Sequence, residues 1–161
     1  MRGFINQLSL WCARLTGVVV VLLTAVLVVS LLASIFYRYV LGHALSWPEE
    51  ISLILFAWIV LLAGSLGVRE RFHVRLTIFT SRLPSAVAHA LDVSVTLAVG
   101  VFGGLLVFAG RDLVARTAQH LTATLRLPLD WLNYAAPVCG LLIVIHTLYL
   151  LTTPPAPEDQ P

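Results

Sequence analysis

The chain has 161 residues, of which 59% are hydrophobic and 11% are charged, and its mean hydropathy is +0.94. Soluble domains carry about 25% charged residues, so a water-soluble fold is excluded, because a chain of this length could not bury so much apolar surface. The formal net charge of +2 is too small to indicate a nucleic-acid partner.

Four charge-free stretches are long enough to cross a bilayer. A helix rises about 1.5 Å per residue, so about 20 residues cross the roughly 30 Å hydrocarbon layer. Each stretch must be helical, because lipid cannot hydrogen-bond to bare backbone and the alternation of a membrane β-barrel is absent. The sequence predicts an all-α integral membrane protein with one membrane domain, 1–161, and a Pro-rich tail at 154–161. The predicted transmembrane helices are 15–37, 51–68, 93–110 and 131–153.

The ends of the first span bear on processing and orientation. We expect this span to be retained rather than cleaved as a signal peptide, because it is too long and leads directly into Tyr37, Arg38 and Tyr39. With four spans, both termini lie on one side, which would hold six arginines against four opposite. This asymmetry favours cytoplasmic termini.

The first loop ends in a polar motif before the second span. Ser46 and Glu49 have the spacing of a capping box, and Pro48 is tolerated in a first helical turn. Capping does not explain Glu50, a second acid at the start of an apolar span. Two hypotheses remain for Glu50, an ion pair with Arg38 or a contact with a partner protein.

A basic segment follows the second span, with Arg69, Arg71, His73 and Arg75 within seven positions. Plotted as a helix, its arginines share one face and its phenylalanines and leucines form a neighbouring stripe. The pattern predicts a short amphipathic helix in the headgroup layer between the second and third spans. A basic stop signal that only fixes topology is the alternative.

Two features predict that the third helix continues past its apolar span. Pro84 suits an early helical position, and Asp112 and Arg116 have the favourable acid-first i,i+4 spacing. A helix of that length must tilt in the bilayer or project from it.

Small residues and one proline predict how the helices pack. Gly100 and Gly104 form a GxxxG pair, and Gly140 follows Ala136 at the same spacing. Such pairs let helices approach closely in lipid. Pro137 frees a backbone carbonyl and predicts a kink near the start of the last helix.

The span interiors contain no Asp, Glu, Lys or Arg. Membrane enzymes and ion carriers keep ionisable groups at that depth for their chemistry. His146 is the one histidine well inside a predicted span, and a hydrogen-bonded packing role is favoured over a ligand role. No phosphate loop, nucleophile motif or zinc spacing occurs. We therefore predict no catalytic, metal, cofactor or substrate site in this chain.

The two loop motifs together resemble those of a known family. The W-x-E-E pattern of residues 47–50 and the R-E-R-x-H-V-R pattern of residues 69–75 are similar to those of the DctQ-type small membrane subunit of tripartite ATP-independent periplasmic (TRAP) transporters. The resemblance covers about residues 10–150 and continues through Trp131, Tyr134 and Pro137. Pro48 occupies the variable position of the first motif.

The resemblance implies a scaffold subunit in the bacterial inner membrane, with both termini cytoplasmic. Its expected partners are membrane lipids, a large elevator-type membrane subunit that carries the sodium and substrate sites, and a periplasmic binding protein that delivers an organic acid. No cofactor is expected in this chain. The residues matched by position are expected to contact partner or lipid rather than substrate: Arg38, Trp47, Glu49, Glu50, Arg69, Arg71, His73 and Arg75.

Two other classes of protein remain as alternatives. A small four-helix membrane enzyme of the glutathione-transferase kind would need charged residues converging inside the helices. A membrane assembly factor without a transport partner would not need the paired loop motifs.

Overall fold

The described part of the chain is a bundle of long helices. A computed structural model describes residues 2–70 and 85–152. Within these ranges no strand forms, and the one β-type contact is an isolated bridge between Leu121 and Pro128. The helices are α1 (Arg2–Tyr39), α2 (Trp47–Arg69), α4 (Ser85–Thr117), α5 (Asp130–Asn133) and α6 (Ala135–Thr152).

Four helical segments are long and apolar enough to cross a membrane. They run Asn6–Tyr39, Trp47–Arg69, Val87–Thr117 and Asp130–Thr152. The predicted all-α fold with four transmembrane helices is confirmed. The predicted interfacial helix and the Pro-rich tail at 154–161 lie outside the described residues.

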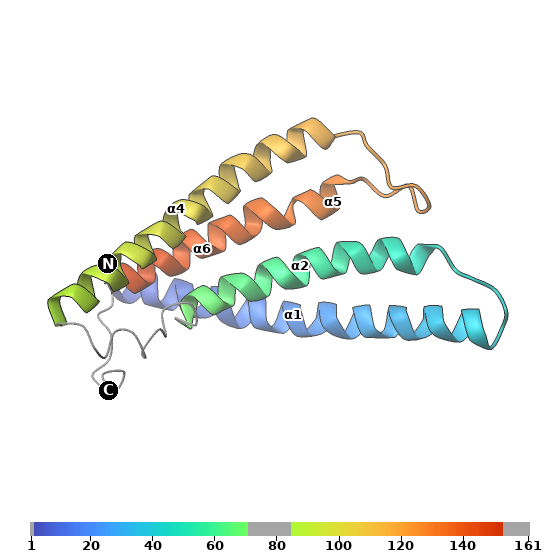
Figure 1. Ribbon diagram of the computed structural model, residues 1–161, viewed down its shortest axis with the longest axis horizontal. Coiled ribbons are helices and arrows are strands. Elements are labelled where there is room, and N and C mark those ends of the chain that lie inside the picture. The colour runs from blue at the N-terminus through green and yellow to red at the C-terminus, as the bar shows by residue number, and fades with distance from the viewer. Residues whose placement is uncertain (1, 71–84, 153–161) are drawn as a thin grey trace.

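The helix α6 lies at the centre of the bundle. It contacts α1, α2 and α4, and α1 also packs along α2. Figure 1 shows α1 and α4 on opposite sides with α2 and α6 between them, and the two outer helices diverge toward the end that carries the 40–46 and 118–129 connections. The beginning of α1 and the ends of α2 and α6 lie toward the other end.

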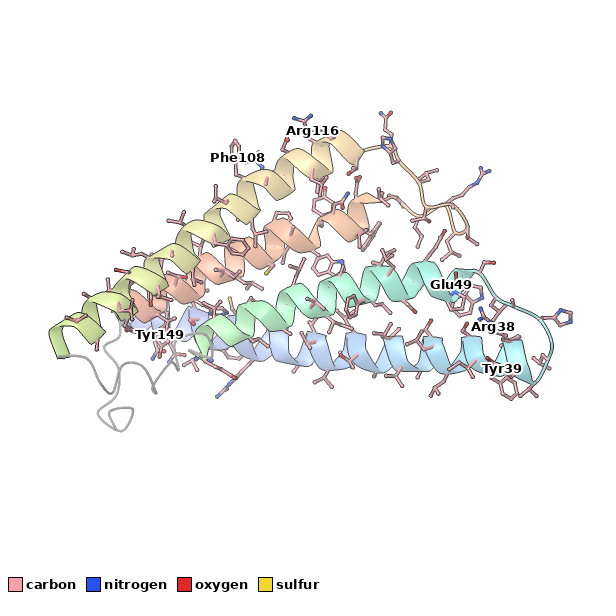
Figure 2. The ribbon with its side chains drawn as sticks, in the orientation of Figure 1. Arg38, Tyr39, Glu49, Phe108, Arg116 and Tyr149 are labelled. Carbon is pink, nitrogen blue, oxygen red and sulfur yellow. The ribbon has the colours of Figure 1, made fainter. Side chains whose placement is uncertain are left out.

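The outer faces of α1 and α4 are apolar and exposed. Val21 on α1 is 68% exposed and Phe108 on α4 is 79% exposed, and Figure 2 shows Phe108 pointing away from the bundle. Leaving such side chains uncovered is unfavourable in water but not in lipid. The arrangement therefore suits a bilayer.

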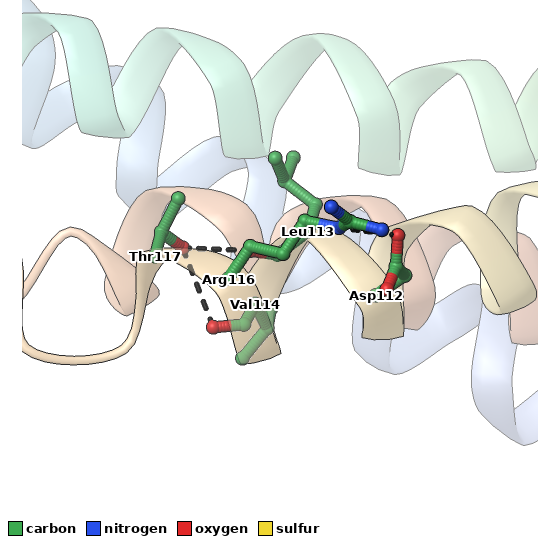
Figure 3. Close-up of polar contacts among 5 residues, drawn as sticks. All are labelled: Asp112, Leu113, Val114, Arg116 and Thr117. Carbon is green, nitrogen blue, oxygen red and sulfur yellow. Dashed lines mark hydrogen bonds and ion pairs between the residues drawn. The ribbon is translucent and has the colours of Figure 1, made fainter.

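The helix α4 is longer than a bilayer is thick. Its 33 residues span about 50 Å, against about 30 Å of hydrocarbon. Arg116 Nε donates to Asp112 Oδ2 at 2.8 Å, as the i,i+4 spacing predicts. Figure 3 shows this pair beside Thr117, whose hydroxyl donates to the carbonyls of Leu113 and Val114. These local bonds extend the helix past its predicted span.

The last span lacks one backbone hydrogen bond near its beginning. Pro137 has no N–H to donate to the carbonyl of Asn133, and this missing bond lies at the boundary between α5, which ends at Asn133, and α6, which begins at Ala135. Tyr134 between them keeps a helical backbone, with a φ of −61° and a ψ of −21°, and Val138 N–H donates to Tyr134 O at 3.2 Å. The span therefore continues from Asp130 to Thr152, and the kink at Pro137 stays a prediction.

Glycines set the closest approach of α4 and α6. A Cβ atom added at Gly140 would lie 2.6 Å from the carbonyl oxygen of Gly103 and 2.8 Å from the amide nitrogen of Val107. One added at Gly100 would lie 2.8 Å from Thr147 Cγ2. The two backbones therefore meet where no side chain fits between them.

Gly104, the second glycine of the predicted GxxxG pair, takes no part in the contact between α4 and α6. A Cβ atom added there would have no atom of another described helix within 4 Å. The close contacts on α4 instead fall at 100, 103, 107 and 110. This alternation of three and four residues follows one face of a helix, whereas a strict four-residue spacing drifts off it.

Replacing Gly140 by alanine is expected to destabilise the bundle. The new methyl group would meet backbone atoms of α4 that cannot rotate away, and such overpacking costs about 1–3 kcal/mol. The apparent Tm of the detergent-solubilised protein measures the loss. Gly104→Ala is the matched control and is expected to leave the Tm unchanged. An equal fall in both variants would contradict the packing of α4 on α6.

Candidate functional site

The first-loop motif forms one polar cluster, at the end of the bundle where α1 meets α2. Arg38 Nη2 lies 3.5 Å from Glu49 Oε1, and the two side chains are 53% and 72% exposed. Figure 2 shows them facing each other across the start of α2. Trp47 is half-buried at the first position of that helix. An ion pair this exposed contributes little to the stability of the fold. It is informative because it shows where the end of α1 meets the start of α2.

Glu50 binds the loop that follows α4. Its Oε1 accepts from the N–H of Thr124 at 2.5 Å, and its Oε2 accepts from the N–H of Leu125 at 2.9 Å. The hypothesis of an ion pair between Arg38 and Glu50 is wrong, because Arg38 pairs with Glu49 while Glu50 faces the other loop. Sequence spacing could not reveal this contact, because it joins positions 74 and 75 residues apart.

The predicted capping box is also wrong. Ser46 is the N-cap of α2, but its side chain makes no capping hydrogen bond. Its φ of −91° and ψ of −26° are helical, whereas a capping serine needs an extended backbone to reach the second or third N–H. Pro48 in the first turn is buried and removes one of the unpaired N–H groups instead.

A second polar cluster joins three helices at the other end. Arg69 Nε donates to Ser9 Oγ at 3.2 Å, and Ser9 Oγ lies 3.0 Å from His146 Nδ1. The guanidinium of Arg69 also lies over the ring of Tyr149, 5.7 Å from its centroid. Ser9 and His146 are fully buried. The cluster ties α1, α2 and α6 together, which fits a packing role for His146.

Sequence reasoning missed Ser9. It lies in the N-terminal dozen residues, where no motif marks it, and 137 positions separate it from His146. Arg69 is the only predicted site residue of the second-loop motif that lies within the described residues. Arg71, His73 and Arg75 lie outside the described residues.

The geometry offers helix association rather than a reaction. Among the described residues, no group of three or more His, Cys, Asp or Glu side chains could hold a metal ion. The polar bonds that cross between helices join side chains to each other or to backbone. Examples are Trp58 Nε1 to the carbonyl of Trp131 at 2.7 Å and Cys139 Sγ to the carbonyl of Leu61 at 2.9 Å.

We expect Ser9 and His146 to be energetically coupled. Hydrogen bonds between membrane helices contribute about 0.6 kcal/mol on average and at most about 1.7 kcal/mol. A double-mutant cycle with Ser9→Ala and His146→Leu should give a coupling energy in that range when unfolding is followed in mixed micelles. Thr24→Val is the control, because the Thr24 hydroxyl bonds only within its own helix. Additive effects of the two substitutions would contradict the cluster.

Comparison with known proteins gives the family. Residues 27–153 match the family described as tripartite ATP-independent periplasmic transporters, DctQ component. The matched region includes α2, α4, α5 and α6 in full and the last part of α1, residues 27–39.

Relatives of known name agree with this match. The chain is 30% identical over 148 residues to the sialic acid TRAP transporter small permease protein SiaQ of Vibrio cholerae, covering 92% of this chain and 82% of that one. It is 25% identical over 149 residues to the sialic acid TRAP transporter permease protein SiaT of Haemophilus influenzae, covering 92% of this chain and 23% of that one. It is 30% identical over 107 residues to the C4-dicarboxylate TRAP transporter small permease protein DctQ of Rhodobacter capsulatus, covering 65% of this chain and 46% of that one. The chain is a multi-pass membrane protein that belongs to the DctQ component family of TRAP transporters, a family of transporter components and not of enzymes.

Proposed function

We propose that this chain is the small scaffold subunit of a TRAP-type secondary transporter. It supports a large elevator-type membrane subunit during sodium-driven uptake of an organic acid that a periplasmic binding protein delivers. The observation that carries the proposal is the 30% identity to a small permease protein over 82% of that protein's length.

The relation to SiaT supports a larger membrane partner. The similarity covers 92% of this chain but only 23% of that permease protein, so a unit like this one occurs there within a much longer chain. A large membrane partner would correspond to the part of SiaT that this chain does not match.

The charge distribution supports a division of labour between the two membrane subunits. The interiors of the spans carry no acidic or basic residue, whereas ionisable residues inside membrane spans mark ion and substrate pathways. The sodium and substrate sites therefore belong to the large subunit. This single membrane domain lies in the bacterial inner membrane with both termini cytoplasmic, as the arginine distribution favours.

The substrate class follows from the names of the relatives. One relative is named for sialic acid and another for C4-dicarboxylates, and both kinds of molecule carry carboxylate groups. The substrates named for both relatives are therefore organic acids that carry a carboxylate group. Sialic acid is the first candidate, because the SiaQ match covers most of both chains.

Reconstitution tests the proposed function. Proteoliposomes containing this chain and its large subunit, supplied with the binding protein and radiolabelled sialic acid or a C4-dicarboxylate, should accumulate one of them only under an inward sodium gradient. Omitting this chain should abolish uptake. Undiminished uptake by the large subunit alone would contradict an essential scaffold role.

The basic segment after α2 is proposed to contact the large subunit or anionic lipid headgroups. Arg71→Ala should then lower the amount of large subunit that co-purifies with this chain several-fold. Arg116→Ala is the control, because Arg116 pairs with Asp112 on its own helix. Full complex yield and full uptake with Arg71→Ala would rule out the interface role of that residue.

A further inference from the structure

The connection between α4 and α5 is a small closed hairpin. The N–H of Thr122 donates to the carbonyl of Leu127 at 2.8 Å, and the N–H of Leu127 donates back to the Thr122 hydroxyl at 3.0 Å. Below these bonds the N–H of Leu129 donates to the carbonyl of His120 at 2.9 Å. Residues 123–126 are left as the tip.

The tip presents two successive N–H groups to one anion. Arg126 has a φ of +52°, the left-handed conformation that a non-glycine residue rarely adopts. Neighbouring N–H groups that converge in such a turn form an anion-binding nest. The N–H groups of Thr124 and Leu125 fill that role, and each binds a different oxygen of the Glu50 carboxylate.

The hairpin follows the polar end of α4. The polar turns of α4 that precede it, with the Asp112–Arg116 pair, extend past the apolar part of that helix. Beyond the hydrocarbon layer, the position of a loop depends on its own contacts. Two other hydrogen bonds join α2 to the α5–α6 segment. Trp58 donates to the carbonyl of Trp131, and the carbonyl of Leu61 accepts from Cys139. Both lie two turns or more further along α2 than Glu50.

An open apolar depression of about 300 Å³ lies between α2 and the hairpin, lined by Ile51, Ile54, Leu55, Leu127 and Trp131. Among the described residues, the hydrogen bonds of Glu50 connect α2 to the tip of the hairpin, at the end where Figure 1 shows α1 and α4 furthest apart.

We propose that Glu50 is a positioning residue, the resident anion of the hairpin-tip nest, and that it latches the α1–α2 pair to the α4–α6 pair at the end opposite the beginning of α1 and the end of α6. The latch holds the exposed side chains of the hairpin, among them Leu121 and Arg126, in a fixed place on that side of the membrane. This device belongs to the chain itself and does not depend on the proposed transport function.

The two oxygens of the carboxylate give a graded test. Glutamine keeps one acceptor oxygen and turns the other position into a donor, so Glu50→Gln retains at most one of the two bonds. Glu50→Ala retains neither. Glu49→Gln is the matched control, because it removes the same charge from the neighbouring position, where the partner is Arg38 and not the hairpin.

Amide hydrogen exchange of the full chain in nanodiscs measures the latch directly. The amides of Thr124 and Leu125 should exchange at least about tenfold faster in Glu50→Ala, with Glu50→Gln between it and the native protein. The amides of Thr122 and Leu129, bonded within the hairpin, should keep their native rates in all variants. Equal protection of Thr124 and Leu125 in Glu50→Ala and Glu49→Gln would overturn the proposal.

A distance measurement tests the mechanical consequence. Spin labels at His43→Cys and Ala123→Cys, with Cys12 and Cys139 replaced by serine, report the separation of the two loops. The distance distribution should be narrow in the native background and in Glu49→Gln, and should broaden in Glu50→Ala. An unchanged distribution in Glu50→Ala would overturn the latch. If Glu50→Ala loses its fold, seen as faster exchange at Leu129 as well, Glu50→Gln decides both measurements.

Discussion

A bilayer covers apolar side chains without drawing helices together, and this constraint governs the whole molecule. Since lipid tails are as apolar as leucine, the helices must associate through close contact and polar bonds. The contact between α4 and α6 meets this need through glycine backbones, with Gly140 against Gly103. Polar bonds meet it between α2 and the last span, where tryptophan and cysteine side chains each reach a backbone carbonyl. A glutamate side chain of α2 likewise reaches the backbone of the connection before that span.

The distribution of polar groups follows from the same constraint. Near the beginning of α1 and the end of α6, Ser9, Arg69 and His146 bind one another, and the span interiors carry no charged side chain. At the opposite end, Glu50 binds the backbone of the hairpin that follows the polar end of α4. A chain with charged groups only at its two ends is suited to support a partner, whereas a chain that carries an ion needs such groups in between.

The fold could be predicted from the sequence, because charge-free runs of bilayer length allow only helices. The continuation of α4 past its apolar part could be predicted from Asp112 and Arg116, because both residues lie on the same helix. Contacts between distant segments could not be predicted in the same way. Glu50 and Ser9 bind residues 60 or more positions away, and Gly104 has the expected spacing but lies off the face of α4 that contacts α6. Local periodicity places a residue on its own helix, while the rotation of that helix against its neighbours depends on every contact in the bundle.

We propose that this chain supports a moving large subunit without moving itself. Distance distributions between spin labels at His43→Cys and Ala123→Cys, recorded in the assembled transporter with and without sodium and substrate, test it most directly. A rigid scaffold predicts one distribution under all conditions while labels in the large subunit shift. A change between these two loops as large as the change in the large subunit would contradict the account.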